Sequence, residues 1–268
     1  MRDDAGVALD SVEGCQQDAK KRRRRLRLAL VVTGLLALIG IVLVMNGLST
    51  SLDQVPPLSR TWYGKDYQAV IARISNNSIP LPLFRNEEGA IILRKLTARE
   101  NLSHFHDDSI PFNVRAQDIA ATAIATESLT NRYYSAARNG RNVHEELTAT
   151  KTFGLFLLAA ELSAVDRAVG TGSIPGADAK QLEKGMGMVD QGTGMVVSGI
   201  VDDLHNRTVF RKADVSEILS ALASTIDVIV RHIPPDRRSH LKDRLTSLVE
   251  SGLEPGDVSN LQKITDAF

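Results

Sequence analysis

A long uncharged segment behind a dense run of basic residues constrains this chain more than any other feature. Residues 28–45 carry no charge, and the span 26–46 is about as long as the roughly 20 residues that a helix needs to cross a bilayer. A cleavable secretion signal has a shorter apolar region and ends in small residues such as Ala-x-Ala. This stretch continues as IGIVLVMNG instead, so the pattern predicts an uncleaved membrane anchor over residues 26–46.

Basic residues crowd only one flank of this anchor. The first charged residue on the far side is Asp53, whereas seven basic residues crowd the eight positions before residue 28: Lys20, Lys21, Arg22, Arg23, Arg24, Arg25 and Arg27. Such a flank stays in the cytoplasm when a helix inserts. We therefore expect a cytoplasmic tail over residues 1–25, a linker over residues 47–57, and an extracytoplasmic domain over residues 58–268.

The composition narrows the class of protein further. Residues 1–27 hold 8 Lys and Arg against 5 Asp and Glu, which leaves 24 against 27 in the rest of the chain. A mildly acidic domain lacks the cationic surface that nucleic acids require, so we expect no nucleic-acid partner. Arg outnumbers Lys by 22 to 10, which is typical of a GC-rich bacterial genome and favours the bacterial inner (cytoplasmic) membrane. Cys15 is the only cysteine, so the domain contains no disulfide.

Helical periodicity with clear stop signals predicts an all-α domain, a bundle of about six to eight helices. Asn113, Asp214 and Asp236 are expected to cap helices, and Asn139-Gly140 is expected to end one. Residues 87–103 could form a helix or a short strand, and their charged second half favours the helix. The longer helices are expected over residues 58–74, 113–138, 142–169, 177–205 and 214–232.

Three short clusters contain residue types that bind metals. HFHDD spans residues 104–108, HEEL begins at His144, and Asp202 lies three residues before His205, as in di-iron bundles. None of the three matches a known metal-binding motif. HEEL lacks a second histidine four residues after the first, and a di-iron bundle needs a second carboxylate–histidine pair and further carboxylates. The chain also lacks a Gly-x-Ser-x-Gly elbow and a Walker loop. We expect no catalytic residue, no metal and no cofactor.

Glycines recur every seven residues in GMGMVDQGTGMVVSG, residues 185–199. Five glycines in one helix cost about 4–5 kcal/mol relative to alanine, so this helix needs compensating contacts. This seven-residue spacing puts one set of residues on a single face of the helix, where the glycines form a groove because they have no side chains. The residues of this face are Gly185, Met188, Gly192, Met195 and Gly199. We expect the small residues of 159–164 or 116–123 to pack there; the alternative is a second copy or another protein.

These features favour a class rather than a named activity. The leading hypothesis is a single-pass membrane protein whose helical domain acts as a non-catalytic scaffold or assembly factor of a cell-envelope complex. Its expected partners are the membrane, other envelope proteins and copies of itself. The alternatives are a ligand-sensing or transport-associated helical domain, and an enzyme with an unrecognised His/carboxylate site.

The anchor hypothesis predicts the topology of the full-length chain. A phosphatase reporter fused after residue 268 should be active outside the cytoplasm, and the protein should sediment with membranes. Replacing Arg22–Arg25 by Ser should weaken or invert this orientation, because the charge asymmetry sets it. Recovery of a soluble form that begins near residue 48 would show that the segment is a cleaved signal.

Overall fold

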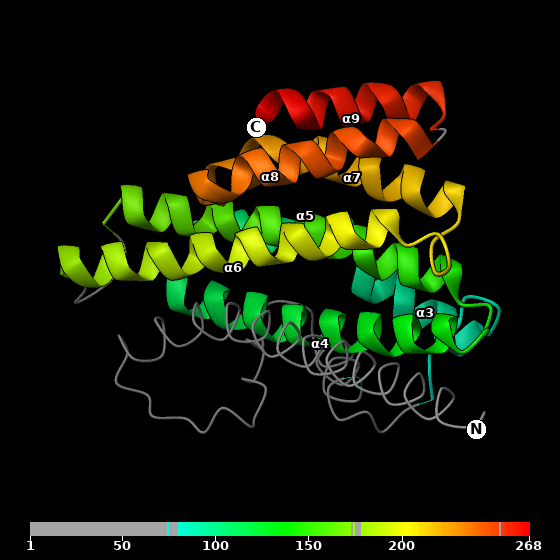
Figure 1. Cartoon of the computed structure of the whole chain (residues 1–268). Coiled ribbons are helices and arrows are strands. Elements are labelled where there is room, and N and C mark those ends of the chain that lie inside the picture. The colour runs from blue at the N-terminus through cyan, green and yellow to red at the C-terminus, as the bar shows by residue number, and fades with distance from the viewer. Residues whose placement is uncertain (1–73, 75–79, 173, 175–177, 252) are drawn as a thin grey trace, which may run out of the picture.

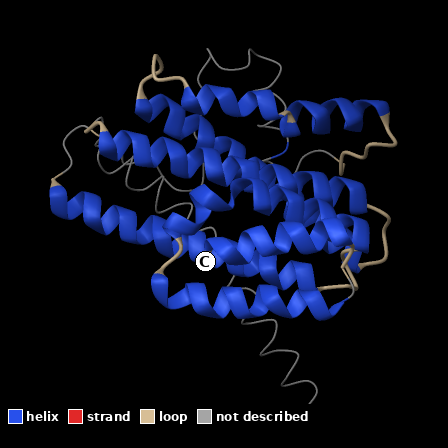
Figure 2. Ribbon diagram, turned by 90° about the horizontal axis from the view of Figure 1, so that it is seen from above, coloured by secondary structure: helices blue, strands red, loops and turns tan. Residues whose placement is uncertain are grey.

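The computed structural model describes residues 74, 80–172, 174, 178–251 and 253–268. The predicted tail, anchor and linker, and all but the last residue of the predicted helix over 58–74, lie outside these residues. All regular structure in the described part is helical, with seven α-helices and no strand (Figure 2). The elements are α3 (Glu87–Thr97), η1 (Arg99–His106), α4 (Phe112–Arg138), α5 (His144–Gly170), α6 (Ala179–His205), α7 (Lys212–Ile229), η2 (Val230–His232), α8 (Pro235–Thr246), η3 (Ser247–Ser251) and α9 (Pro255–Ala267).

The helices stack around α5 (Figure 1). Helix α4 packs on one side of α5 and α7 on the other, while α9 packs on the far side of α7. Helix α6 returns alongside α4 and α5 and makes its closest backbone approach to η2 and α8. The all-α expectation is therefore confirmed, and residues 87–97 form a helix rather than a strand.

Helix α5 is enclosed on every side. Sixteen of its 27 residues are buried, including all six consecutive residues from Leu157 to Leu162. Successive residues of a helix point in directions about 100° apart, so six buried in succession cover the whole circumference. The continuously apolar residues 153–160 belong to this helix. Its sequence is therefore apolar nearly all round, as expected of an interior helix.

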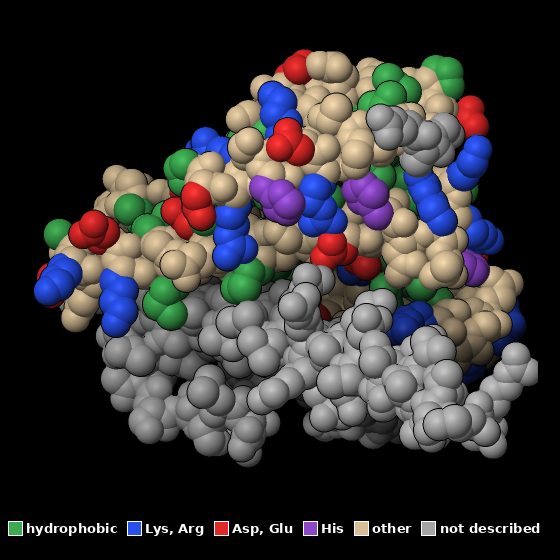
Figure 3. Space-filling model, in the orientation of Figure 1, with side chains coloured by type: hydrophobic (Ala, Val, Ile, Leu, Met, Phe, Trp, Pro, Cys, Tyr) green, Lys and Arg blue, Asp and Glu red, His purple; other side chains and the backbone are tan. Residues whose placement is uncertain are grey.

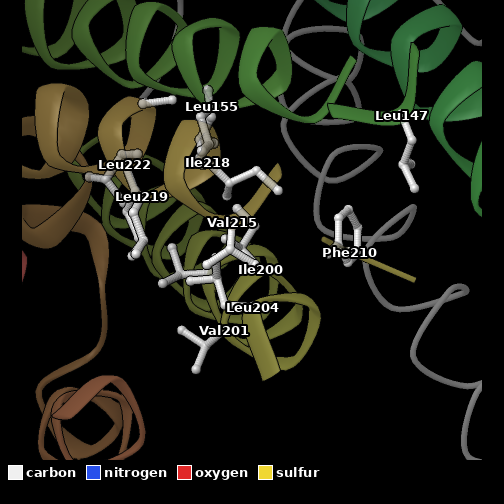
Figure 4. Packing of buried hydrophobic residues seen from close by; sticks show 14 of the residues in the cluster. Leu147, Leu155, Ile200, Val201, Leu204, Phe210, Val215, Ile218, Leu219 and Leu222 are labelled. Atoms are coloured by element: carbon white, nitrogen blue, oxygen red, sulfur yellow. The ribbon is translucent and has the colours of Figure 1, made fainter. Parts of the chain in front are cut away.

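Figure 4 shows part of the core around α5, where the labelled side chains come from α5, α6, α7 and the loop between α6 and α7. Leu155 of α5 lies against Ile218 of α7, and Leu147 points toward Phe210 in the loop between α6 and α7. Helix α6 contributes its C-terminal half, with Ile200, Val201 and Leu204. Burial of these aliphatic side chains compensates for the glycines earlier in α6, at roughly 1.5–3 kcal/mol for each large side chain.

An extended segment, residues 80–86, is held against the ends of α4 and α5. The hydroxyl of the buried Tyr133 donates to the carbonyl of Pro82, and the amide of Phe84 donates to Glu146 Oε1 at 2.9 Å. A Cβ on Gly89 would collide with the backbone of Leu83, so only glycine allows this close approach. The segment is fixed by buried hydrogen bonds from both helices.

Glycine ends two of the helices in the left-handed conformation. Gly140 follows α4 with φ of 77°, which confirms the end predicted at Asn139-Gly140, and Gly172 follows α5 with φ of 63°. Three predicted N-caps are wrong. Helix α4 begins one residue before Asn113, and α8 begins at Pro235, ahead of Asp236. Asp214 is the third residue of α7, where it accepts the amide of Arg211 at 2.8 Å.

The errors at Asn113 and Asp236 share a physical cause. Proline suits the first turn of a helix because its φ is preset and its missing N–H would have no partner there. Pro111 and Pro234 hold the capping positions of α4 and α8, so neither helix uses a side-chain cap. Helix α6 does have a capping box, in which Asp178 and Gln181 bond each other's backbone amides. No described helix is both long and apolar enough to span a membrane.

Helix α6 meets the start of α8 at Gly194. A Cβ at this position would lie 3.1 Å from the Cδ atoms of Pro234 and Arg237, so a longer side chain has no room. Gly187 lies seven residues earlier on the same helix, where a Cβ would meet nothing within 4 Å.

We expect Gly194→Leu to lower the free energy of unfolding by about 1–3 kcal/mol, because it overpacks this contact. Gly187→Leu is the matched control and should raise stability by up to about 1 kcal/mol, since leucine favours the helical backbone. Denaturant unfolding of both full-length variants measures the difference. Equal stability of the two would contradict the close packing of α6 on α8.

Candidate functional site

A cavity of about 360 Å³ lies between α4, α5 and α6. Its volume falls in the range of small-molecule sites, which commonly form between the helices of bundles. Most of its wall is apolar, with polar groups at a few positions. The lining residues that matter below are Ala123, Thr126, Glu127 and Asn131 of α4, Lys151, Gly154, Leu157, Leu158 and Glu161 of α5, and Met195, Gly199, Asp202 and Asp203 of α6.

Small residues leave this space open. Gly154 on α5 and Gly199 on α6 both line the cavity, and a Cβ at either position would meet nothing within 4 Å. Ala123 adds a third small residue, from α4. Larger side chains would reach into the cavity without disturbing the helical backbone. The cavity therefore follows from the sequence of the three helices.

Glu161 is the unusual residue of the cavity wall. It follows Lys151, Gly154, Leu155 and Leu158 at helical spacing, so it lies on the face of α5 that lines the cavity. Its residue surface is only 5 % exposed, and no other described residue forms a hydrogen bond or an ion pair with its carboxyl group. Burial alone raises the pKa of Glu161 to about 7. A carboxyl group of this kind changes its charge in the physiological range.

A second carboxyl group, that of Glu127, faces the cavity from α4. Burial raises its pKa, while the nearby Lys151 and a hydrogen bond from Asn131 oppose the rise. Lys151 is itself in an ion pair with Asp203 of α6. The buried hydroxyl of Thr126, one residue before Glu127, has no hydrogen-bond partner as an acceptor or donor. Nearby groups therefore offset part of the effect of burial on the carboxyl group of Glu127, whereas no described residue offsets it at Glu161.

The remaining acidic residue of the cavity wall, Asp202, pairs with a basic residue that lies outside the wall. This partner is Arg244 of α8. At the same end of the cavity, the amide of Asn206 donates to the hydroxyl of Tyr134 at 2.9 Å. Paired charges therefore gather at the end of the cavity near Lys151. Glu161 lies ten residues further along α5, about 15 Å away at 1.5 Å per residue.

The predicted glycine face divides between three environments. Gly185 and Gly192 are buried, and Met188 is half-buried, outside the cavity lining. Met195 and Gly199 line the cavity. The close approach to another element occurs at Gly194, which lies outside the predicted row. The face as an interaction surface for another protein stays a prediction.

The HFHDD cluster separates into different contacts. His104 points inward, where its Nε2 lies 2.8 Å from the buried Asp118. Asp108 pairs with Arg115 and Arg167, at 3.0 Å each, and these contacts hold its pKa below the ordinary value. Among the described residues, no group of three or more His, Cys, Asp or Glu is arranged to hold a metal ion.

The other two predicted clusters are also separated by their contacts. Asp202 pairs with Arg244, whereas His205 bonds the hydroxyl of Ser247 at 3.1 Å. His144 opens α5, so HEEL is the charged first turn of this helix. Its Nδ1 lies 3.5 Å from Asp214.

One further cluster of charged groups has no counterpart in the sequence analysis. His232 of η2 is buried between Asp166 of α5 and Asp190 of α6, with ring nitrogens 2.9 and 3.0 Å from the two carboxylates. Arg231 also pairs with Asp166, at 3.1 Å. These contacts join the far end of α6 to the turn between α7 and α8, outside the cavity.

Sequence reasoning missed Glu161 and Glu127. Glu161 did give a signal, because it is the only charged residue between Phe153 and Val165 of an otherwise apolar helix. A lone acid in a helix that is buried all round must either pair or face a cavity. No comparable signal marks Glu127, whose neighbours are polar.

Comparison with known proteins gives no relative. No family model, no curated protein and no solved structure matches this chain.

The raised pKa of Glu161 predicts a pH dependence of stability. The unfolded chain releases this proton near pH 4.5 and the folded chain near pH 7, so the folded state loses stability as pH rises between these values. Glu161→Gln should remove this loss of stability, because glutamine does not ionise. The variant should match the natural chain at pH 4.5 and exceed its free energy of unfolding by up to about 3 kcal/mol at pH 8. Denaturant unfolding across this range measures it, and an advantage independent of pH would refute the assignment.

Proposed function

We propose that this protein is a helical ligand-binding domain, held at a membrane by residues 26–46, whose cavity between α4, α5 and α6 takes a small, mostly apolar molecule. The single observation that supports the proposal is the unpartnered carboxyl group of Glu161 in the cavity wall. A buried polar group without a partner costs roughly 1–3 kcal/mol. A ligand that bonds this group recovers the cost, and its apolar part gains from burial against Leu157, Leu158 and Met195.

The membrane part of the proposal rests on the sequence. Residues 26–46 have the length and flanking charges of an anchor whose N-terminus stays in the cytoplasm. The bacterial inner membrane is the proposed location.

The scaffold hypothesis stays a prediction beside this one. Positive and negative side chains alternate over the described part of the face in Figure 3, which favours solubility rather than a particular partner. The exposed large apolar side chains of the described residues are Ile91, Val249 and Val258, on α3, η3 and α9. Ligand binding is supported by a more specific observation than the scaffold hypothesis, namely the position of Glu161 in the cavity wall.

Filling the cavity tests the proposal. The double variant Gly154→Leu/Gly199→Leu adds two side chains to the cavity on backbone that favours leucine. Its matched control is Gly170→Leu/Gly187→Leu, which changes one exposed glycine on each of the same two helices, where a Cβ also meets nothing within 4 Å.

The neutral probe is phenylbutanol, added to the full-length protein in detergent. At about ten times its dissociation constant it should raise the thermal midpoint of the natural chain and of the control by about 3–6 °C. It should leave the filled variant unchanged, because the space is occupied. An equal rise in all three proteins would show that the probe binds elsewhere, and no rise in any would refute ligand binding by this cavity.

A further inference from the structure

We infer that the ligand of this cavity is an organic cation, an amine with an apolar body, whose ammonium group pairs with Glu161. The inference rests on the proposed function and adds the chemical class of the ligand. It follows from the balance of charged groups in the cavity wall and from the position of Glu161, the charged group of this wall that pairs with no other described residue.

The charged groups that face the cavity come from all three of its helices. They are Glu127 of α4, Lys151 and Glu161 of α5, and Asp202 and Asp203 of α6. Lys151 pairs with Asp203, and Arg244 of α8 pairs with Asp202. Once these pairs are removed, two carboxyl groups remain and no cation. The cavity therefore lacks one positive charge next to its most buried acid.

An ammonium group supplies that charge with good geometry. It donates up to three hydrogen bonds, and a bond between two ionised groups is roughly twice as strong as one between neutral groups. An anionic ligand would instead meet two carboxyl groups, with Lys151 already paired.

The shape of the cavity sets the form of the cation. Between Glu161 and the paired groups near Lys151, α5 presents Leu158, Leu157 and Gly154 to the cavity, and α6 presents Met195. This apolar stretch is about 15 Å long, from ten residues at 1.5 Å each. It fits a short alkyl or aryl chain, with methionine adapting to its outline.

Matched probes of one shape and three charges test the inference on the full-length protein. Titration calorimetry should give phenylbutylamine a dissociation constant at least tenfold below that of phenylbutanol at pH 8, and phenylbutanoate the weakest binding. Between pH 8 and pH 6 the affinity for the amine should fall about tenfold, because the ionised fraction of a group with a pKa of about 7 falls by that factor. The affinity for the alcohol should stay within about twofold.

Glu161→Gln should abolish the preference for the amine while the alcohol still binds, and its expected higher stability keeps loss of folding out of the result. Glu217→Gln is the matched control: this glutamate of α7 also has a raised pKa but is exposed and outside the cavity wall. It should keep the preference in full. Loss of the preference in Glu127→Gln with its retention in Glu161→Gln would overturn the pairing.

The inference and the function it rests on fail in different ways. If the alcohol binds as tightly as the amine, and the Gly154→Leu/Gly199→Leu variant loses both, the cavity binds ligands but the cation assignment is wrong. If none of the three probes responds to filling of the cavity, the proposed function itself is wrong.

Discussion

The enclosure of α5 is the constraint on which the remaining structure depends. A helix buried over its whole circumference needs neighbours on every side, and α3, α4, α7 and η1 supply most of them. Polar side chains on such a helix also need partners, and Thr150 and Thr152 find them by donating to the carbonyls of Glu146 and Thr148, one turn back. Glu161 has no such partner among the described residues, and it lies where α5 lines the cavity.

The sequence predicts a structural feature well when the residues that cause it lie close together in the chain. The ends of α4 and α5 were readable because glycine at φ near 70° has no good substitute. The starts of α4 and α8 were misread because an Asn or Asp near a proline suggests a cap, whereas the proline itself occupies the boundary. These signals act within four residues and need no knowledge of the fold.

The cavity was harder to predict from the sequence, because its wall is formed by residues on three helices. Gly199 and Met195 were singled out as part of a heptad face, but nothing local shows that they border empty space with Gly154. Glu127 gave no signal at all, since an acid among polar residues is ordinary on a helix surface. Its place beside the cavity depends on how α4, α5 and α6 pack together, a relation that periodicity within one helix cannot express.

The docking of residues 80–86 has a mechanical consequence. Pro82 and Phe84 are bonded to Tyr133 and Glu146, side chains of the two helices that also carry Glu127 and Glu161. A force on residues 80–86 would therefore reach both α4 and α5 through these two hydrogen bonds, and these two helices also line the cavity.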